Sequence, residues 1–358
     1  MAGFSMRPCG DFRTGYGQEV TLFPTVTSLR FLLAGVALLL IAPFFLDRYY
    51  LTLLIQIGYL GIAALGLNIV TGFTGQISLG HAAFFGFGAF CSAWLNNSFG
   101  VPVLLAVPLA GLATTFVGML FGAPAARIRG LYLAIATLAA QYILEDFFNR
   151  ATWFTGGAAG AVANPVSLFG HGIATEQGYF YVVLFFVVTM YLFAANLFRT
   201  RTGRALLAIR DHYIAAEIMG ISLPMHRILA FGISAFYAGV AGALMGHFVG
   251  FVSTESINLL LSIQMLGMVI IGGLGSVMGS LLGTAFMVLL PEVLDGAVHT
   301  LKAVWAGVDD LLGQGGLHYL KEISVGLVIV VFLIFEPEGL AHRWRLVKSY
   351  WKLYPFSH

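Results

Sequence analysis

Ten stretches of this chain are each close to the length of a membrane-spanning helix and almost free of charge. Crossing the hydrocarbon core of a bilayer takes about 20 apolar helical residues. The ten candidate spans are residues 29–46, 50–70, 78–96, 101–122, 131–148, 179–198, 228–250, 259–273, 277–295 and 322–335. Glycine-rich sequence interrupts the third and the eighth, so either is a span or a broken, re-entrant helix. We therefore expect an all-α polytopic membrane protein with eight to ten transmembrane helices.

The composition supports lipid rather than water as the solvent. Of 358 residues, 59% are hydrophobic and 9% are charged, whereas soluble domains carry about 25% charged residues. A soluble domain cannot cover so much apolar surface, which excludes a cytosolic enzyme and a nucleic-acid-binding protein. A membrane β-barrel would alternate apolar and polar residues, whereas the apolar runs here are continuous. The 44 glycines suit closely packed membrane helices.

The basic residues predict an orientation. If the N-terminus is cytoplasmic, most of the 18 Lys and Arg residues fall on the cytoplasmic side, as the positive-inside rule requires. This arrangement is N-in and C-in. It predicts a cytoplasmic tail at 1–28, a transmembrane domain at 29–340 and a second cytoplasmic tail at 341–358. Within the transmembrane domain, the loop 149–178 then lies outside and the loop 199–227 lies inside.

The loop 199–227 contains an amphipathic helix. Apolar residues recur at helical spacing at Leu206, Ile209, Tyr213 and Ala216. Thr202 is suited to cap a helix that starts near Gly203, and Gly220 is suited to end it. One interpretation is an interfacial helix anchored to anionic membrane lipid by its arginines. The other is a docking helix for a cytosolic partner, with small side chains such as Ala215 and Ala216 fitting a groove.

Residues 67–90 combine glycines with polar side chains. A helix can break at membrane depth only where its backbone is buried in protein or lines a wet cavity. The candidate pathway residues here are Gly72, Thr74, Gln76, Ser78 and His81. An ionisable residue inside a span indicates a functional site, although a lone histidine is often only hydrogen-bonded to a neighbouring carbonyl. The sequence of 71–80 is faintly similar to that of 271–280, by internal repetition or by coincidence.

Polar residues in the fifth and eighth spans are a further set of candidates. They include Gln141, Ser262 and Gln264. The amide of Gln264 faces a pathway or joins two helices by hydrogen bonds. The chain has no Walker-type glycine loop, so it is not expected to hold ATP itself. It also lacks the histidine and cysteine motifs of a metal site, and we expect no resident cofactor.

Several long motifs together resemble the LivM-type permeases, which are the branched-chain amino acid permease subunits of bacterial ATP-binding-cassette (ABC) importers. The resemblance extends over about residues 50–340. It is carried by LNIVTGFTGQISLGHAAFFGFGAF, LYLAIATLAAQYI, WFTGGAAG, RTRTGRALLAIRDHYIAAEIMGISL, AFGISAFYAGVAGALMGHFVGFVSTES, MVIIGGLGSVMGSLLGTAF and FEPEGL. The family implies a helical fold similar to the type II ABC importer permeases and a multi-pass location in the bacterial inner membrane.

The resemblance also implies partners. A LivM-type permease pairs with a LivH-type permease, two cytosolic ABC ATPase subunits bind ATP and Mg²⁺ below them, and a periplasmic binding protein delivers the substrate. The loop 199–227 then corresponds to the ATPase-coupling region, which favours the docking interpretation. The coupling residues carried over are Arg204, Arg210, Asp211, Ala215, Ala216 and Gly220.

One motif departs from the family pattern. The outer, periplasmic loop of the family reads T-G-G-x-(Asn/Asp)-G, and the matching residues here are Thr155, Gly156, Gly157 and Gly160. Ala159 occupies the position of the family's Asn or Asp. The expected substrate is therefore a branched-chain amino acid or a related small polar or organic-acid solute, including urea, amides and aromatic acids.

The sequence thus predicts a non-enzymatic permease subunit that imports its solute by alternating access, driven by partner ATPases. The alternative is a stand-alone channel or secondary carrier. It would move solute without ATP and without other subunits.

Overall fold

The computed structural model describes residues 26–128, 130–168, 171–172, 175–304, 316–336 and 338–353. Most of the tail predicted at 1–28 and the last residues of the tail predicted at 341–358 lie outside this part of the chain. Each of the ten predicted spans coincides with a helix. These helices are α2 (Val26–Ile41), α3 (Arg48–Thr74), α4 (His81–Phe99), α5 (Val103–Gly122), α6 (Leu131–Arg150), α8 (Glu176–Leu197), α10 (Leu223–Val249), α11 (Leu259–Gly272), α12 (Val277–Val304) and α14 (Gly316–Phe335).

Shorter elements connect these helices. They are η1 (Ala42–Phe44), η2 (Ala123–Ala126), α7 (Thr152–Thr155), η3 (Gly157–Ala159), β1 (Ala161–Val162), β2 (Ser167–Leu168), β3 (His171–Gly172), α9 (Arg201–Ile218), β4 (Phe251–Val252) and α15 (Gly339–Leu353). The strands form two small antiparallel pairs, β1 with β4 and β2 with β3. The β1–β4 pair ties the loop 149–178 to the chain just after α10, with Ala161 opposite Val252.

Six helices in the described residues are long and apolar enough to cross a membrane, or up to seven if the bent pair of α14 and α15 is one span. The six are α3, α5 continued by η2, α6, α8, α10 and the first 20 residues of α12. Helix α11 is apolar but has only 14 residues. Helix α4 is long enough, but His81 and the Asn96–Asn97 pair lower its hydropathy. The molecule is thus an all-α polytopic membrane protein.

Helix α10 lies at the centre of the bundle and packs against α3, α4 and α5. Within their apolar windows, α3 is 78% and α10 is 72% buried, whereas α5, α6, α8 and α12 are 33–39% buried. Glycines allow this packing. A Cβ added to Gly88 of α4 would lie 2.3 Å from the Cα of Gly239, and one added to Gly242 would lie 1.8 Å from the carbonyl oxygen of Phe85. Close backbone approach of this kind is typical of membrane helices.

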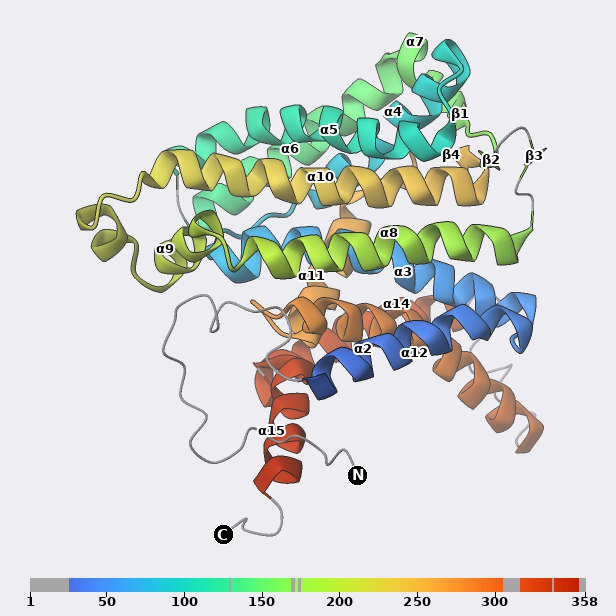
Figure 1. The fold of residues 1–358 in the computed structure, drawn as a ribbon. Helices are drawn as coiled ribbons and strands as arrows, with labels where there is room; N and C mark the ends of the chain where they lie inside the picture. Colours follow the sequence, from blue (N-terminus) through green and yellow to red (C-terminus); the bar gives the residue numbers. More distant parts are fainter. Residues whose placement is uncertain are drawn as a thin grey trace.

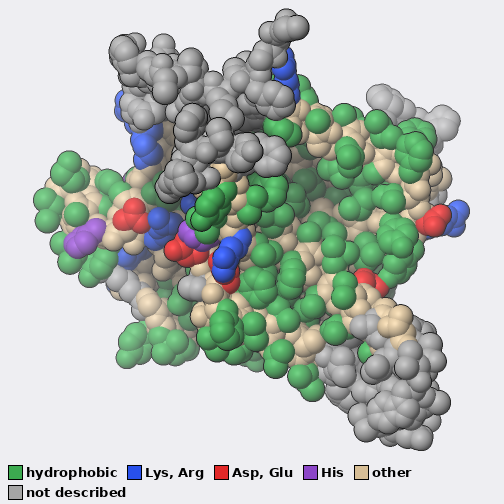
Figure 2. Space-filling model, turned by 90° about the horizontal axis from the view of Figure 1, so that it is seen from below, with side chains coloured by type: hydrophobic (Ala, Val, Ile, Leu, Met, Phe, Trp, Pro, Cys, Tyr) green, Lys and Arg blue, Asp and Glu red, His purple; other side chains and the backbone are tan. Residues whose placement is uncertain are grey.

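The two ends of the bundle differ. In Figure 1, α8 and α10 run side by side along the bundle, with α9 at one end and α7 and the strands at the other. Helix α15 runs across their direction in the same view. Figure 2 shows hydrophobic side chains over most of one face, with charged side chains gathered mainly toward the end where α9 lies. Exposed apolar residues such as Phe116 and Leu120 belong to the outer surface of α5, as a lipid environment permits.

Candidate functional site

Helix α4 begins beside the middle of α3 rather than beside its end. The Nε2 atom of His81, the first residue of α4, lies 2.9 Å from the carbonyl oxygen of Ala63. Ala63 precedes the last residue of α3, Thr74, by 11 positions, or about 16 Å of helix. The residues between Thr74 and His81 therefore run back along α3 without helical structure. A carbonyl only accepts hydrogen bonds, so Nε2 of His81 carries the hydrogen.

Side chains from α6 and α11 pair the free backbone groups at this start of α4. The first N–H groups of a helix have no partner within it. Here the N–H of Ala82 donates to the Ser262 hydroxyl at 2.9 Å, and the N–H of Ala83 donates to Oε1 of Gln141 at 2.8 Å. The N–H of Leu79 donates to the Thr137 hydroxyl at 2.9 Å. The sequence singled out Gln141 and Ser262 as polar residues inside spans, but it gave no sign that both would meet at one helix start.

Gln141 also reaches the start of α11. Its side chain is fully buried. Its Nε2 donates to the carbonyl of Ile257 at 3.2 Å, and its Oε1 also accepts from the Ser262 hydroxyl at 3.3 Å. Helices α4 and α11 thus begin near each other, and a single amide contacts both starts. Discontinuous helices that begin at mid-depth are the places where transporters build solute sites. We call this region the mid-depth junction.

The predicted pathway residues extend from this junction to the end of α3, because His81 begins α4 at the junction whereas Thr74 ends α3. In this chain Gly72, Thr74, Gln76, Ser78 and His81 are buried, and Gln264 is half-buried. The Gln76 side chain donates to the Thr74 hydroxyl at 3.0 Å. Within the described residues, Oε1 of Gln76 and the hydroxyl of Ser78 are buried without a hydrogen-bond partner. His81 is held by the Ala63 carbonyl, as in the simpler of its two interpretations. A pathway role for these residues stays a prediction.

Helix α9 begins two residues earlier than predicted. Its N-cap is Thr200, whose hydroxyl accepts a hydrogen bond from the N–H of Gly203 at 3.2 Å, so the predicted cap at Thr202 is wrong. The chain leaves α9 at Gly220, where φ is +85°, as a glycine allows. The backbone of His212 is not helical, with φ −157° and ψ 90°, so α9 consists of two parts joined at a kink. No periodicity in the sequence indicated this kink.

The kink separates an anchored part of α9 from an exposed one. Leu206 and Ile209, before the kink, are buried at 0% and 4% exposure. Leu206 packs in a cluster with Val70 of α3 and Phe231 of α10. Beyond the kink Ala216 is buried, but Ile218 and Met219 are 80% and 81% exposed. Of the predicted stripe, Tyr213 is the exception, because it is 39% exposed.

The predicted coupling residues do not follow this division, because Arg204 before the kink is exposed and Ala216 beyond it is buried. The guanidinium of Arg210 donates to the carbonyl of Gly72 at 3.0 Å and forms an ion pair with Asp211 at 2.9 Å. Arg204 donates to the carbonyl of Arg199 at 2.6 Å, within its own loop. Ala215 and Gly220 are exposed, and Ala216 is buried. Arg210 is therefore partly exposed but contacts the end of α3 through its guanidinium, whereas Ala215 and Gly220 belong to the exposed surface without such a contact to α3.

The two glycine-rich segments that looked alike in sequence are both breaks between helices. Residues 75–80 separate α3 from α4, and residues 273–276 separate α11 from α12. The breaks are neighbours in space, because a Cβ added to Gly72 would lie 2.3 Å from the backbone nitrogen of Gly275.

The loop 149–178 is shaped by its glycines. Gly156, Gly157 and Gly160 all have φ between 70° and 75°, a region that disfavours other residues. Thr155 is buried, and its hydroxyl accepts from the N–H of Gly157 at 3.0 Å. Thr155 and the glycines therefore set the backbone of the loop. Ala159, the position where the family motif has Asn or Asp, is exposed.

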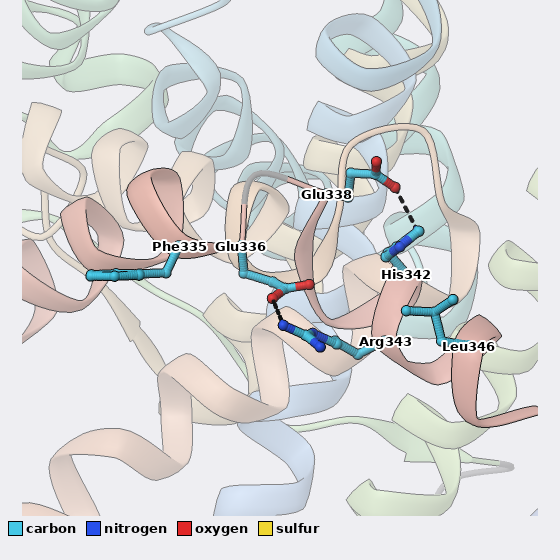
Figure 3. A pocket seen from close by; sticks show the side chains of 6 residues that line it. All are labelled: Phe335, Glu336, Glu338, His342, Arg343 and Leu346. Carbon is cyan, nitrogen blue, oxygen red and sulfur yellow. Dashed lines mark ion pairs between the residues drawn. The ribbon is translucent and has the colours of Figure 1, made fainter.

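A hollow of about 280 Å³ lies at the bend between α14 and α15. It is lined by Phe335, Glu336, Glu338, His342, Arg343 and Leu346. Two ion pairs join its charged side chains, Arg343 with Glu336 at 2.6 Å and His342 with Glu338 at 2.5 Å (Figure 3). The hydrogen bond and the charge of Glu336 raise the pKa of Arg343 above its ordinary value, so the guanidinium stays ionised. The described residues contain no group of three or more His, Cys, Asp or Glu that could hold a metal ion.

Comparison with known proteins identifies the family of this chain. Residues 49–334 match the family model described as the permease component of branched-chain amino acid transport systems. The chain is 33% identical to the high-affinity branched-chain amino acid transport permease LivM of Salmonella typhimurium and 34% identical to LivM of Escherichia coli K12. Each match covers 88% of this chain and 75% of the relative. LivH of Escherichia coli K12 is 22% identical, over 79% of this chain and 91% of LivH. No solved structure matches the chain.

Proposed function

This chain belongs to the family of branched-chain amino acid transport permeases, and from that membership we propose that it is the LivM-like permease subunit of a bacterial ABC importer. As a multi-pass membrane permease, it is a transport subunit rather than an enzyme. The ATP and Mg²⁺ of the cycle are bound by partner subunits, and the chain needs no cofactor of its own. Its location is the bacterial inner membrane.

The proposed topology has eight to ten spans with both termini in the cytoplasm. It rests on the grouping of basic residues at the α9 end of the bundle. The basic loop 199–227 lies there, and Arg127 follows η2, which packs against α10 at the same end. Arg150 lies at the other end, beside α7. The positive-inside rule then makes the α9 end cytoplasmic and the strand end periplasmic.

The partners follow from the relatives. One organism, Escherichia coli K12, has a LivM and a LivH that both match this chain. A LivH-type permease is therefore the proposed partner in the membrane, and the two permeases enclose the pathway. Two cytosolic ABC ATPase subunits and a periplasmic binding protein complete the importer.

The observation that carries the proposal is the exposed tip of α9. Ile218 and Met219, at the end of α9, are large apolar side chains that are 80% and 81% exposed. Helix α9 lies at the end of the molecule where the charges gather (Figures 1 and 2). Exposed apolar patches rimmed by polar residues mark protein or membrane interaction sites, and the family's coupling region favours a protein here. An amphipathic helix that presents an apolar edge suits a groove on a partner. We propose that the groove belongs to an ATPase subunit and that α9 binds in it.

The proposed cargo is a branched-chain amino acid or a related small polar or organic-acid solute. The curated LivM relatives support the first of these. Ala159 is the reason to retain a related small polar or organic-acid solute as cargo. At this position of the exposed outer loop a methyl group replaces the polar side chain of the family motif. The buried Gln76 and Ser78 atoms without partners, in the segment between α3 and α4, are the groups we propose to meet the solute during transport.

The mechanism is alternating access. ATP binding closes the ATPase subunits and displaces α9. The movement passes to the helix breaks beside α9, and one face of the permease pair opens as the other closes. The pathway binds the solute weakly, because a tight site would not release it.

Docking of the ATPase is tested at the tip of α9. The double variant Ile218→Asp and Met219→Asp should lower ATPase co-purification and substrate uptake together, because a charged tip cannot enter an apolar groove. The matched control is Val162→Asp, an exposed apolar residue at the opposite end, which should leave co-purification unchanged. Full co-purification of the ATPase with the double variant would contradict the proposed docking.

The alternative function is tested in proteoliposomes. If the chain alone takes up solute without ATP, it is a channel or secondary carrier. The importer proposal requires that uptake appear only with both permeases, the two ATPases, the binding protein and ATP.

A further inference from the structure

Arg210 connects three parts of the bundle that the sequence keeps far apart. We infer that Arg210 is a positioning residue that fixes α9 to the break after α3 and to the break between α11 and α12. Displacement of α9 then reaches both breaks at the same time. This inference rests on the proposed function, because it describes how movement imposed by an ATPase reaches the pathway.

The first contact joins α9 to α3. The last carbonyl groups of a helix lack partners within it, and Gly72 lies two residues before the end of α3. The guanidinium of Arg210 donates to that carbonyl at 3.0 Å. A cation is favoured at the negative end of a helix dipole. Asp211 forms an ion pair with the same guanidinium at 2.9 Å.

The second contact joins Arg210 to the break between α11 and α12. A Cβ added to Gly275 would lie 2.7 Å from Nη1 of Arg210 and 3.1 Å from the carbonyl oxygen of Gly72. Gly275 has φ +76° as well, so both its conformation and its surroundings favour glycine. The Arg210 side chain thus lies beside both breaks while it remains 36% exposed, with its Cγ 3.4 Å from a Cβ added to Gly75.

The third contact joins the two breaks directly. Asn68 lies about one turn before Gly72 on α3 and is fully buried. Its Nδ2 donates to the Ser276 carbonyl at 2.9 Å and to the Ser280 hydroxyl at 2.8 Å. Its Oδ1 accepts from the N–H of Gly275 at 2.8 Å. One amide therefore holds the end of α3 to the start of α12 with three hydrogen bonds.

These contacts assign Arg210 a role different from docking. The exposed apolar tip, Ile218 and Met219, lies beyond the kink at His212, whereas Arg210 lies before it and donates to the carbonyl of Gly72. The tip is suited to receive movement from a partner. Arg210 and Asn68 are suited to pass it on, because their hydrogen bonds join α9 to the end of α3 and the end of α3 to the start of α12.

The test compares two arginines of the same helix in the complete importer. Arg210→Met removes the charge and every donor while it keeps the length of the side chain. Arg201→Met makes the same change at an exposed position at the start of α9. Two readouts are taken. Co-purification of the ATPase is measured in detergent, and the amount of solute imported per ATP hydrolysed is measured in proteoliposomes.

We expect Arg210→Met to retain the ATPase but to import at least about fivefold less solute per ATP, the lower end of measured site-to-site couplings. Arg201→Met should keep the normal ratio. An unchanged ratio in Arg210→Met would overturn the inference. Loss of ATPase co-purification would also overturn it, because Arg210 would then act in docking. Uptake by the chain alone, without ATP, would instead contradict the proposed function.

A second variant addresses the case in which Arg210→Met folds poorly. Asn68→Ala removes the contact between the breaks without changing α9. It should lower the solute imported per ATP in the same direction. In the double variant, the fold-decrease in solute imported per ATP should be smaller than the product of the fold-decreases of the two single variants. The reason is that residues of one network are not independent. Independent effects would show that the two residues do not share a route.

Discussion

Gln141 illustrates how single buried polar groups hold this fold. Its side chain amide accepts from the Ala83 N–H and donates to the Ile257 carbonyl, and both contacts lie inside the bundle. In a membrane interior no water replaces a lost partner. The start of α4 and the approach to α11 therefore depend on one residue of α6.

Gln141→Leu should destabilise the protein strongly. It leaves the N–H of Ala83 and the carbonyl of Ile257 buried and unpaired, at about 1–3 kcal/mol for each group. Thermal unfolding of the purified protein in detergent measures the effect as a lower Tm. The control is Tyr142→Leu, at a neighbouring position that is 52% exposed. If both variants unfold at the temperature of the unchanged protein, Gln141 does not hold the junction.

Individual residues were only partly predictable. Gly220 ends the helix of the coupling loop, as expected, because only a glycine tolerates its conformation easily. The paired roles of Gln141 and Ser262 could not be derived, because their contacts join residues 121 positions apart. Arg210 was predicted as a coupling residue from the resemblance, but nothing in the sequence indicated that its side chain reaches Gly72.

Among the elements, α9 shows how one helix can combine anchoring and exposure. Its first part is held by Leu206, which is fully buried against Val70 and Phe231. Its last part extends Ile218 and Met219 away from the bundle. The kink at His212 lets these two parts face different surroundings.

Leu206→Ala should loosen the first part of α9. Truncating a buried leucine costs about 2–5 kcal/mol where the cavity cannot close. Limited trypsin digestion at the arginines of the loop 199–227 should therefore become faster in inverted membrane vesicles. Ile214→Ala, at a position that is 49% exposed on the same helix, serves as the control and should not change the rate. Equal rates for all three proteins would mean that Leu206 does not anchor α9.

At the scale of elements, hydropathy alone located ten helices. It did so because long apolar runs have few other stable forms in lipid. It could not distinguish a helix that crosses the bilayer from one that starts halfway, since both are apolar. The late start of α4 depends on contacts with α3, α6 and α11, which no local pattern contains.

The whole molecule has two chemically different ends, and this asymmetry makes the proposed orientation testable. In a background with Cys9→Ser and Cys91→Ala, a single cysteine is placed at Arg201 or at Ala158. Both positions are exposed. A membrane-impermeant thiol reagent should label Ala158→Cys in spheroplasts, whose inner membrane is intact. It should label Arg201→Cys only in inverted vesicles. The reverse pattern would place α9 outside and contradict the proposed importer.

The contacts that complete the mid-depth junction also set an order for its biosynthesis. The partners of the first backbone groups of α4 follow 58 residues later, at Gln141, and 180 residues later, at Ser262. A ribosome therefore delivers α4 to the membrane well before either partner exists. Until then, its leading turn needs water, lipid headgroups or an insertion factor. The nascent chain would thus be most vulnerable to quality-control proteases before α11 emerges, and a truncation ahead of Ser262 should be degraded more quickly than the complete protein.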